Sequence, residues 1–237
     1  MNIKPKLLPS QLLGQQNDHI HWLNGHTGIH TGMLNAYLQM QAAARKKGID
    51  LRIASGWRGF ERQLQLWNNK FLGFTDVKST EGKKIDISEF TDHEKIMSIL
   101  TFSALPGASR HHWGTDIDVY APNLLSDEVQ LQLEASEYSE TGPFAALSEW
   151  LNQNSQKFGF YFPYDCYRGG IAHEPWHLSY APLADHFQQQ FTIQLLASAI
   201  ENSNIEGKSA VLTHLDDIYQ HFIININQAE DKLNRLK

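Results

Sequence analysis

The stretch SRHHWGTDID, residues 109 to 118, holds two adjacent histidines, a glycine and two aspartates within ten positions. A second cluster, HEPWH, lies far downstream at residues 173 to 177. Histidine and aspartate side chains are common ligands of metal ions. Whether these two clusters meet at one ion is the question that decides the fold and the chemistry of the chain.

The second cluster matches the HExxH pattern, in which two histidines one helical turn apart bind zinc and the glutamate acts as a base. That pattern functions only on a helix. Pro175 lies between the two histidines and Gly169-Gly170 lies just upstream, so no established helix can run through His173. We therefore predict that Glu174 and His177 belong to the site, that His173 lies outside it, and that the proline marks a bend.

His111 and Asp118 can converge if the chain turns at Gly114, which lies between them. Together with His177 they would offer two imidazole nitrogens and one carboxylate oxygen. This set suits one Zn²⁺ ion per chain and leaves a fourth position for water, which indicates catalysis more than scaffolding. Glu174 beside that water could take its proton, while the ion stabilises the negative oxygen that develops when the water attacks a carbonyl.

Hydrophobic periodicity divides the chain into helices mixed with a few separated strands. Apolar spacing predicts helices at 31–47, 60–71, 126–137 and 143–157, and a capping box at Thr91 and Glu94 predicts another. Alternation or aromatic enrichment predicts strands at 49–53, 114–120, 158–162 and 176–180. The strand at 114–120 is expected to have one polar face. The polar segment 74–90 is expected to be an exposed loop. Without a regular βαβ rhythm, this order indicates an α+β fold with a small, mainly antiparallel sheet flanked by helices.

After Pro182 the pattern is helical, and we expect a helical C-terminal extension at about 182–237 packed on a core at about 30–180, within a single domain over 1–237. Apolar residues recur every three or four positions from Leu212 to Leu236. Packing on the parent domain is the favoured interpretation of this stripe, which predicts a monomer. A dimer through the C-terminal helix is the alternative.

Composition excludes several classes of function. The 26 acidic residues outnumber the 20 Lys and Arg residues and no basic stripe is present, so we predict no nucleic-acid partner. Cys166 is the only cysteine, which excludes an internal disulfide framework and any multi-cysteine metal site. No segment approaches the roughly 20 apolar residues of a bilayer span, so we predict no membrane partner. The first 25 residues lack a secretory pattern, and we expect a cytoplasmic protein, or a periplasmic or cell-wall one if a leader was removed.

Three spaced motifs in this chain resemble those of the LAS metallopeptidases, specifically the VanY-like D-alanyl-D-alanine carboxypeptidases. The SxHxxGxxxD motif is matched by Ser109, His111, Gly114 and Asp118, and the ExxH motif by Glu174 and His177. SGWRGFERQ, residues 55–63, is similar to the SGYRSxxxQ segment of that family. The resemblance covers roughly residues 30 to 180 and leaves out the N-terminal 25 residues and the helical C-terminal region.

The resemblance implies roles for seven residues. It implies His111, Asp118 and His177 as zinc ligands, Glu174 as general base, Arg58 as the cation that polarises the scissile carbonyl, and Ser109 and Gln63 as substrate-pocket residues. The implied activity is zinc-dependent removal of a terminal D-alanine from peptidoglycan-derived peptides. L,D-carboxypeptidase or endopeptidase activity of the same fold is an alternative, and a non-catalytic zinc-containing binding module is an alternative from another class.

Asp116 departs from the family pattern, in which many members carry alanine. It lies two residues before Asp118 and therefore on the same face of the predicted strand. It could orient a ligand histidine, bind a substrate amine, face solvent, or replace Asp118 on the metal. We favour support of a ligand histidine. Neighbouring His112 is expected to project away from the site in a structural or supporting role.

Overall fold

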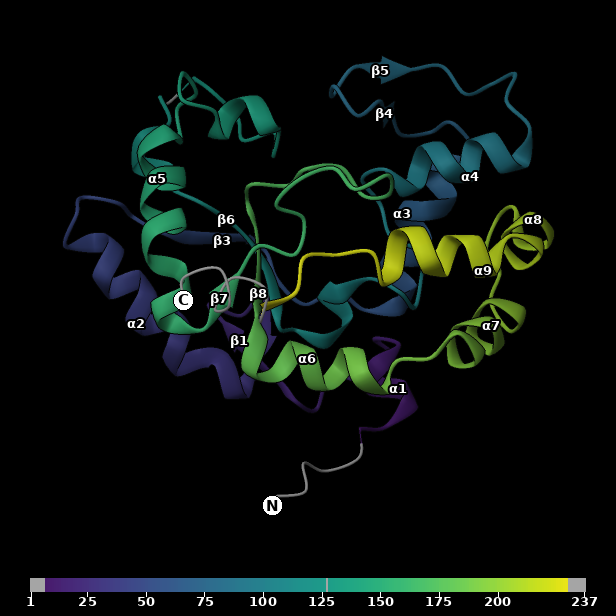
Figure 1. Cartoon of the computed structure of the whole chain (residues 1–237), viewed down its shortest axis with the longest axis horizontal. Coiled ribbons are helices and arrows are strands. Elements are labelled where there is room, and N and C mark those ends of the chain that lie inside the picture. The colour runs from purple at the N-terminus through teal and green to yellow at the C-terminus, as the bar shows by residue number, and fades with distance from the viewer. Residues whose placement is uncertain (1–6, 127, 230–237) are drawn as a thin grey trace.

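The computed structural model describes residues 7–126 and 128–229 and has a four-stranded antiparallel sheet at its centre. The strands lie in the order β3 (Arg52–Ser55), β6 (Asp116–Tyr120), β8 (His177–Tyr180) and β7 (Phe160–Tyr161). Every neighbouring pair in this sheet is antiparallel. A small antiparallel sheet flanked by helices confirms the predicted α+β class (Figure 1).

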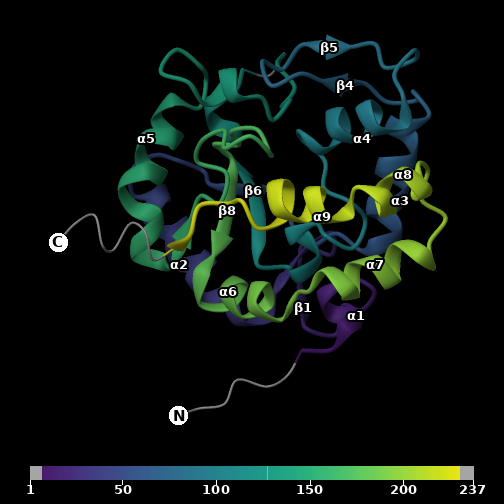
Figure 2. The same ribbon diagram turned by 45° about the vertical axis from the view of Figure 1, so that its right-hand side comes forward.

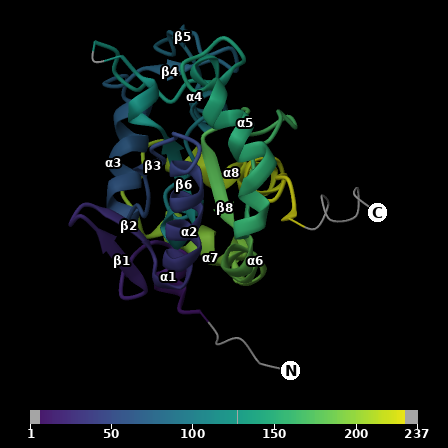
Figure 3. The same cartoon turned by 90° about the vertical axis from the view of Figure 1, so that its left-hand side faces the viewer.

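One face of the sheet is apolar and covered by two helices. Ile117, Val119 and Leu178 are fully buried in a core that they share with α2 (Leu34–Arg45) and α5 (Ala145–Asn154). Figure 3 views the molecule from the side of these two helices. The apolar face therefore anchors the two central strands, β6 and β8, by hydrophobic burial.

The opposite face of the same strands is polar and also buried. Asp116 and Asp118 alternate with the apolar residues of β6, and His177 and Ser179 do so on β8. The register pairs Asp118 with His177 and Asp116 with Ser179. The polar face predicted for residues 114–120 is present, and it lies inside the molecule.

Most helices lie where the sequence predicts them. A 3-10 turn at Thr31–Met33 leads into α2, α3 occupies Phe60–Phe71, and α5 is followed by a 3-10 turn at Ser155–Phe158. α4 (Asp92–Leu100) begins with the predicted capping box, in which the Thr91 hydroxyl accepts from Glu94 N and the Glu94 carboxylate accepts from Thr91 N. Intrinsic helix signals and tertiary packing agree in these segments.

The predicted helix at 126–137 is wrong, because only Ala135–Tyr138 forms a single 3-10 turn within the described part of that region. Leu133 has a φ of 52°, in the left-handed region that interrupts a right-handed helix. The Tyr138 hydroxyl donates to Val119 O at 2.7 Å and ties the turn to β6. A tertiary contact overrides local helix propensity here.

Two further predictions are displaced. The strand predicted at 49–53 forms at 52–55, and the segment 74–90, predicted as a loop, contains a short hairpin of β4 (Val77–Lys78) and β5 (Lys84–Ile85). Each strand of this hairpin has only two residues, so no alternation of apolar and polar residues can be recognised in the sequence.

The C-terminal extension begins beneath β8 in the view of Figure 1 and continues to the side of the molecule away from α2 and α5 (Figures 1 and 2). Its helices are α6 (Ala181–Gln190), α7 (Ile193–Glu201), α8 (Lys208–Thr213) and α9 (Leu215–Ile218), with a π-helical turn at Tyr219–Ile223. Leu215, Ile218 and Phe222 are buried in a second apolar core together with α3 and α4. We propose on this basis that the chain forms one domain.

The apolar stripe predicted from Leu212 to Leu236 is not one continuous helix. Asn225 and Asn227 lie beyond the π-helical turn, and their side-chain amides donate to backbone carbonyls of the loop 162–168 at 2.8 and 2.9 Å. Leu233 and Leu236 lie outside the described residues. The monomer and the alternative dimer both stay predictions.

An N-terminal hairpin, which the sequence patterns do not predict, is hydrogen-bonded to the turn that leads into β6. It consists of β1 (Ile20–Leu23) and β2 (Thr27–His30) and follows the short helix α1 (Pro9–Leu12). His30 N donates to Gly114 O at 2.7 Å. Gly114 has a φ of 69°, and a Cβ there would lie 2.4 Å from the Ile20 side chain, so both its conformation and its surroundings require glycine. Among the described residues no helix is long and apolar enough to cross a membrane.

We expect the free energy of unfolding to fall as the pH is lowered from about 6.5 to about 4, in part because of His30. Burial, together with neighbouring His19, lowers the pKa of His30 to about 4 from its ordinary 6.5. Between these values the unfolded chain binds a proton that the folded chain does not, so stability is lost as the pH falls. A proton bound only by the unfolded chain changes the free energy of unfolding by about 1.4 kcal/mol per pH unit in this range. Because His30 is partly exposed, we expect a smaller change of roughly 0.5–1 kcal/mol per pH unit.

Urea unfolding at several pH values, compared between the parent and His30→Asn, measures this contribution. Asparagine can accept the hydrogen bond that His30 Nδ1 accepts from Gly32 N, so the variant keeps the cap. It loses the titration and the ring contacts with His19 and Phe187, of which only the titration changes the pH dependence. Its unfolding free energy should depend less on pH than that of the parent. Equal slopes in the two proteins would contradict the prediction.

Candidate metal centre

Two loops meet above the sheet and place the first part of the site. Residues 56–58, which connect β3 to α3, lie against residues 111–112, which form part of a 3-10 helix at Arg110–Trp113. Trp57 Nε1 donates to His112 O at 2.9 Å and Arg58 N donates to His111 O at 3.1 Å. In return, His111 Nδ1 pairs with Gly56 O at 2.9 Å and His112 Nδ1 with Arg58 O at 2.5 Å.

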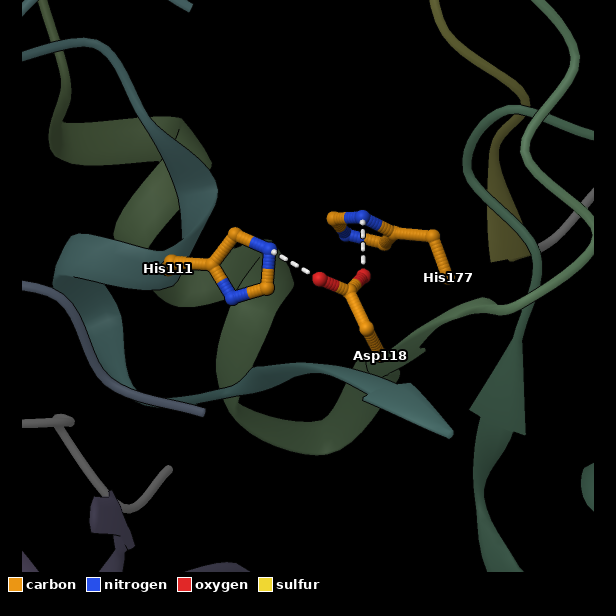
Figure 4. Close-up of side chains that lie close together, drawn as sticks. All are labelled: His111, Asp118 and His177. Atoms are coloured by element: carbon orange, nitrogen blue, oxygen red, sulfur yellow. Dashed lines mark ion pairs between the residues drawn. The ribbon is translucent and has the colours of Figure 1, made fainter. Parts of the chain in front are cut away.

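His111, Asp118 and His177 converge at one point, as the sequence predicts. Each offers a ligand atom, and these atoms all lie within 4.8 Å of one another in a buried cluster. His111 Nε2 lies 3.4 Å from Asp118 Oδ2, and His177 Nδ1 lies 3.3 Å from Asp118 Oδ1 (Figure 4). The chain turns at Gly114 as predicted, with His111 on a 3-10 helix rather than in extended structure.

Hydrogen bonds on the outer edges of the two imidazoles fix which nitrogen faces the cluster. Gly56 O accepts a hydrogen bond from His111 Nδ1, so the neutral form of this ring carries its lone pair on Nε2. On the other ring, His177 Nε2 donates a hydrogen bond to Asp116 Oδ1 at 3.1 Å, so the neutral form of this ring carries its lone pair on Nδ1. Both free lone pairs therefore point to the carboxylate of Asp118, the arrangement that a bound cation needs.

Asp116 is fully buried and belongs to a network behind His177. Arg110 Nε lies 2.7 Å from Asp116 Oδ1, and the hydroxyls of Thr115 and Ser179 donate to Asp116 Oδ2 at 2.8 and 3.1 Å. Burial raises the pKa of Asp116, but the Arg110 guanidinium and His177 together outweigh this effect and hold that pKa below its usual range. Asp116 is therefore ionised, and it contacts His177 from outside the cluster.

His112 points away from the cluster and braces the backbone. Its Nε2 accepts from Gly107 N at 3.0 Å while its Nδ1 donates to Arg58 O, so the ring is neutral with a fixed tautomer. Burial lowers the pKa of His112 to about 3, which keeps the ring uncharged at neutral pH. The expected structural role of His112 agrees with these contacts.

Glu174 reaches the cluster from a turn, not from a helix. His177 N donates to Glu174 O at 3.1 Å, which closes a four-residue turn with Pro175 in its second position. Glu174 Oε2 lies 3.2 Å from His177 Nδ1. His173 is exposed. The predicted bend at the proline is present.

Negative charge concentrates around His177. Burial disfavours a protonated ring, yet the carboxylates of Asp116, Asp118 and Glu174 together raise the pKa of His177 well above its ordinary value. Burial raises the pKa of Asp118, but His111 and His177 bring it below its usual range. The centre thus stabilises a positive charge at the point where the lone pairs meet.

Arg58 lies at the edge of the cluster on the loop before α3. Its Nη1 donates to Gln63 Oε1 and its Nη2 donates to Ser55 Oγ, both at 2.9 Å. Burial lowers the pKa of Arg58, while the nearby carboxylates of Asp118 and Glu174 raise it. The guanidinium is therefore oriented by neutral partners beside the carboxylates of the site.

The two residues that the resemblance places in the substrate pocket differ in their surroundings. Gln63 is 1% exposed, and its amide is occupied on both sides, by Arg58 and by Ala104 O at 2.7 Å. It acts through Arg58 in this structure. Ser109 is buried at the start of the 3-10 helix, and its hydroxyl has no hydrogen-bond partner among the described residues.

One observation that does not depend on the sequence motif indicates that the cluster can hold a metal ion. Asp118 Oδ1 is buried and has no hydrogen-bond partner among the described residues. An unsatisfied buried carboxylate oxygen costs free energy, and a cation between it and the two imidazoles would remove that cost. Two nitrogens and one oxygen form a donor set that suits zinc.

Two contributors to the site are not evident from the sequence patterns. Arg110 lies inside the quoted stretch and precedes the ligand His111, and its ion pair with Asp116 spans only six positions. The one sequence signal for this pair is that Arg110 lies close in the chain to Asp116, the acidic residue that departs from the family pattern. The backbone carbonyl of Gly56 leaves no side-chain signal.

Comparisons with known proteins identify the family of the chain. The model of the family described as VanY, D-alanyl-D-alanine carboxypeptidase, matches residues 26–183. The chain belongs to this family. Membership supports a peptidase and confirms the resemblance carried by the three motifs.

Relatives of known sequence include both uncharacterised and named proteins. An uncharacterised protein of Haemophilus influenzae is 40% identical over 126 residues, which are 52% of this chain and 96% of that protein. A D-alanyl-D-alanine carboxypeptidase of Enterococcus faecalis is 28% identical over 151 residues, which are 62% of this chain and 46% of that enzyme.

Two solved structures of VanY proteins share the fold. VanYB in complex with D-alanine-D-alanine aligns with a TM-score of 0.52 and 21% identity, over 80% of this chain and 92% of that one. A glutamate-to-alanine mutant of a VanY D,D-pentapeptidase in complex with Zn(II) aligns with a TM-score of 0.51 and 24% identity, over 77% and 92%. At these identities the likeness concerns the fold alone.

We expect the double substitution Arg110→Met with Asp116→Ala to weaken Zn²⁺ binding by about 10- to 100-fold, because His177 loses the acceptor that fixes its ring. Removing both charges avoids a single unpaired buried ion, so the chain should still fold. Competition with a chromogenic chelator measures the affinity, and thermal unfolding of the metal-free protein checks the fold.

Arg52→Met with Asp50→Ala is the matched control, because it removes another Arg-Asp pair, at 2.8 Å and more exposed. Its zinc affinity should equal that of the parent. If the Arg110 and Asp116 variant also binds zinc as tightly as the parent, the buried pair serves the fold alone.

Proposed function

We propose that this protein is a zinc-dependent carboxypeptidase that removes a terminal D-alanine from peptidoglycan-derived peptides. The observation that carries the proposal is the buried cluster of His111, Asp118 and His177 with the Glu174 carboxylate at its border, in a chain of the VanY family. The D-alanine-D-alanine bound to VanYB supports the substrate class.

Zinc is the proposed ion, held by His111 Nε2, His177 Nδ1 and the carboxylate of Asp118. The Zn(II) complex of a VanY D,D-pentapeptidase supports this choice. When bound, zinc supplies a Lewis acid and lowers the pKa of water, which makes hydroxide available near neutral pH. The residues around it determine where the protons and the charges of the reaction go.

Glu174 is the proposed general base. Its Oε2 lies 3.2 Å from His177 Nδ1, so the carboxylate borders the same centre as the ligands. Glu174 takes a proton from the attacking water and gives it to the departing amine nitrogen, so the free amino group of D-alanine leaves neutral. The turn at Pro175 holds Glu174 in place, because His177 N is bonded to the carbonyl of the same residue.

Arg58 is the proposed donor to the oxygen of the scissile carbonyl. Negative charge develops on that oxygen when water attacks, and a donor that is already oriented stabilises it without reorganising. Gln63 and Ser55 orient the guanidinium. In this account Gln63 positions Arg58, and Ser109, whose hydroxyl has no partner among the described residues, binds the peptide.

Two alternatives have different consequences. L,D-carboxypeptidase or endopeptidase activity would use the same ligands and the same base with a different peptide. A zinc-containing binding module would need neither Glu174 nor Arg58 at the centre, and the contacts of both residues with the site favour an enzyme.

We expect Glu174→Gln to lower the rate of hydrolysis by about 10²- to 10⁴-fold, because the amide cannot accept the proton of water. The zinc content should stay near that of the parent, since Glu174 is not a proposed ligand. Incubation with tetrapeptide and pentapeptide stems, followed by mass analysis of the products, measures activity and distinguishes D,D from L,D cleavage.

His173→Ala is the control, because it changes the exposed neighbour of Glu174 and should keep full activity. A zinc-loaded parent that releases no D-alanine from any stem would discard the carboxypeptidase and favour the binding module. An active Glu174→Gln protein would move the role of base to another residue.

A further inference from the structure

Two cationic side chains that interact electrostatically with Glu174 have only neutral hydrogen-bond partners. The Arg58 guanidinium donates to Gln63 and Ser55, both at 2.9 Å, and the Lys70 ammonium donates to Ser103 Oγ at 2.6 Å. Within the part of the chain that the structure describes, neither cation forms an ion pair with a carboxylate of the protein. Their positive charges are available to a ligand.

Both cations are anchored to the same short stretch of chain. Gln63, which holds the guanidinium, donates its amide to Ala104 O at 2.7 Å, and Ser103, which holds the ammonium, is the residue before it. Lys70 lies seven positions after Gln63 on α3, so the two side chains project from one face of the helix. Helical side chains tilt toward the N-terminus of their helix, which directs the Lys70 ammonium toward Arg58.

The electrostatic surroundings of Lys70 agree with a place near the reacting groups. Burial lowers the pKa of Lys70, the Arg58 guanidinium lowers it further, and the Glu174 carboxylate raises it. Burial lowers the pKa of Arg58 in the same way, against the carboxylates of Asp118 and Glu174. Both cations therefore interact with Glu174, the proposed base.

The chain pairs its other buried guanidinium directly. Arg110 lies 2.7 Å from Asp116 Oδ1 at a fully buried position. A partly buried cation without a countercharge is costly, and a bound anion would remove that cost. In the proposed reaction Asp118 serves the metal and Glu174 carries the proton, so a carboxylate of the substrate would supply the countercharge that Lys70 lacks.

We propose that Lys70 binds the free C-terminal carboxylate of the peptide and thereby restricts the enzyme to the removal of a terminal residue. This inference rests on the proposed function and deepens it. Arg58 meets the scissile carbonyl oxygen, and the carboxylate of the terminal D-alanine, which follows that carbonyl by one residue, meets the ammonium. A peptide that continues beyond the scissile bond, or ends in an amide, has no anion for Lys70.

The test compares a pentapeptide stem ending in D-alanyl-D-alanine with the same stem ending in a C-terminal amide. The parent should cleave the acid far faster than the amide. Lys70→Met keeps a side chain of similar length without the charge, and it should raise the KM for the acid by about 10- to 100-fold with little change for the amide. Lys70→Arg, which keeps a cation, should retain part of the preference for the acid.

Lys84→Met is the matched control, because Lys84 is exposed on β5 and its loss should leave both substrates unaffected. A parallel measurement uses proteins carrying Glu174→Ala, which removes the base, and records calorimetrically the binding of D-alanyl-D-alanine and of its amide with and without Lys70→Met. Thermal unfolding verifies that each variant folds.

The outcomes separate this inference from the proposed function. An active parent whose acid-to-amide ratio is the same in Lys70→Met overturns the role of Lys70 and leaves the carboxypeptidase standing. Binding of the free dipeptide that depends on Lys70, in a parent that hydrolyses no stem, supports the anion site and discards the carboxypeptidase. Binding that is equal for acid and amide overturns the anion site in either case.

Discussion

The site depends on the hydrogen-bonded junction between residues 56–58 and 111–112. Four hydrogen bonds join these two segments, which lie more than fifty positions apart in the chain. Because His111 is on one segment and Arg58 on the other, the junction fixes a proposed metal ligand and the proposed oxyanion donor relative to each other. The ring of His112 has to be neutral in this arrangement, since its Nδ1 donates to Arg58 O while its Nε2 accepts from Gly107 N.

A second constraint is the distribution of buried charge along the polar face of the sheet. Alternation along β6 and β8 brings Asp116, Asp118 and His177 to one side, and this side is enclosed instead of facing solvent. Arg110 balances Asp116, whereas Asp118 has one oxygen without a hydrogen-bond partner among the described residues. The remaining negative charge is therefore concentrated at the point where the two imidazole lone pairs meet.

The sequence predicts much of this arrangement and fails where contacts are distant. Glycine stops, a capping box and apolar spacing are local signals, and they place α2, α3, α4 and α5 correctly. Pro175 predicts the bend at Glu174 for the same reason, because its effect on the backbone is local. The region 126–137 has helical spacing, yet the positive φ of Leu133 and the bond from Tyr138 to β6 depend on the folded chain. The N-terminal hairpin and the neutral environment of Lys70 likewise become visible only in three dimensions.

Arg110 and Asp116 depend on each other, because each is a buried charge that the other balances. Without Arg110, the carboxylate of Asp116 would be a buried anion that lacks its guanidinium counterion, and with alanine at position 116, Arg110 would be a buried cation that lacks its carboxylate. The two residues are therefore tolerable only as a unit. Asp116 also accepts a hydrogen bond from His177 Nε2. The orientation of His177, a proposed ligand, therefore depends on Arg110, which is not itself a ligand.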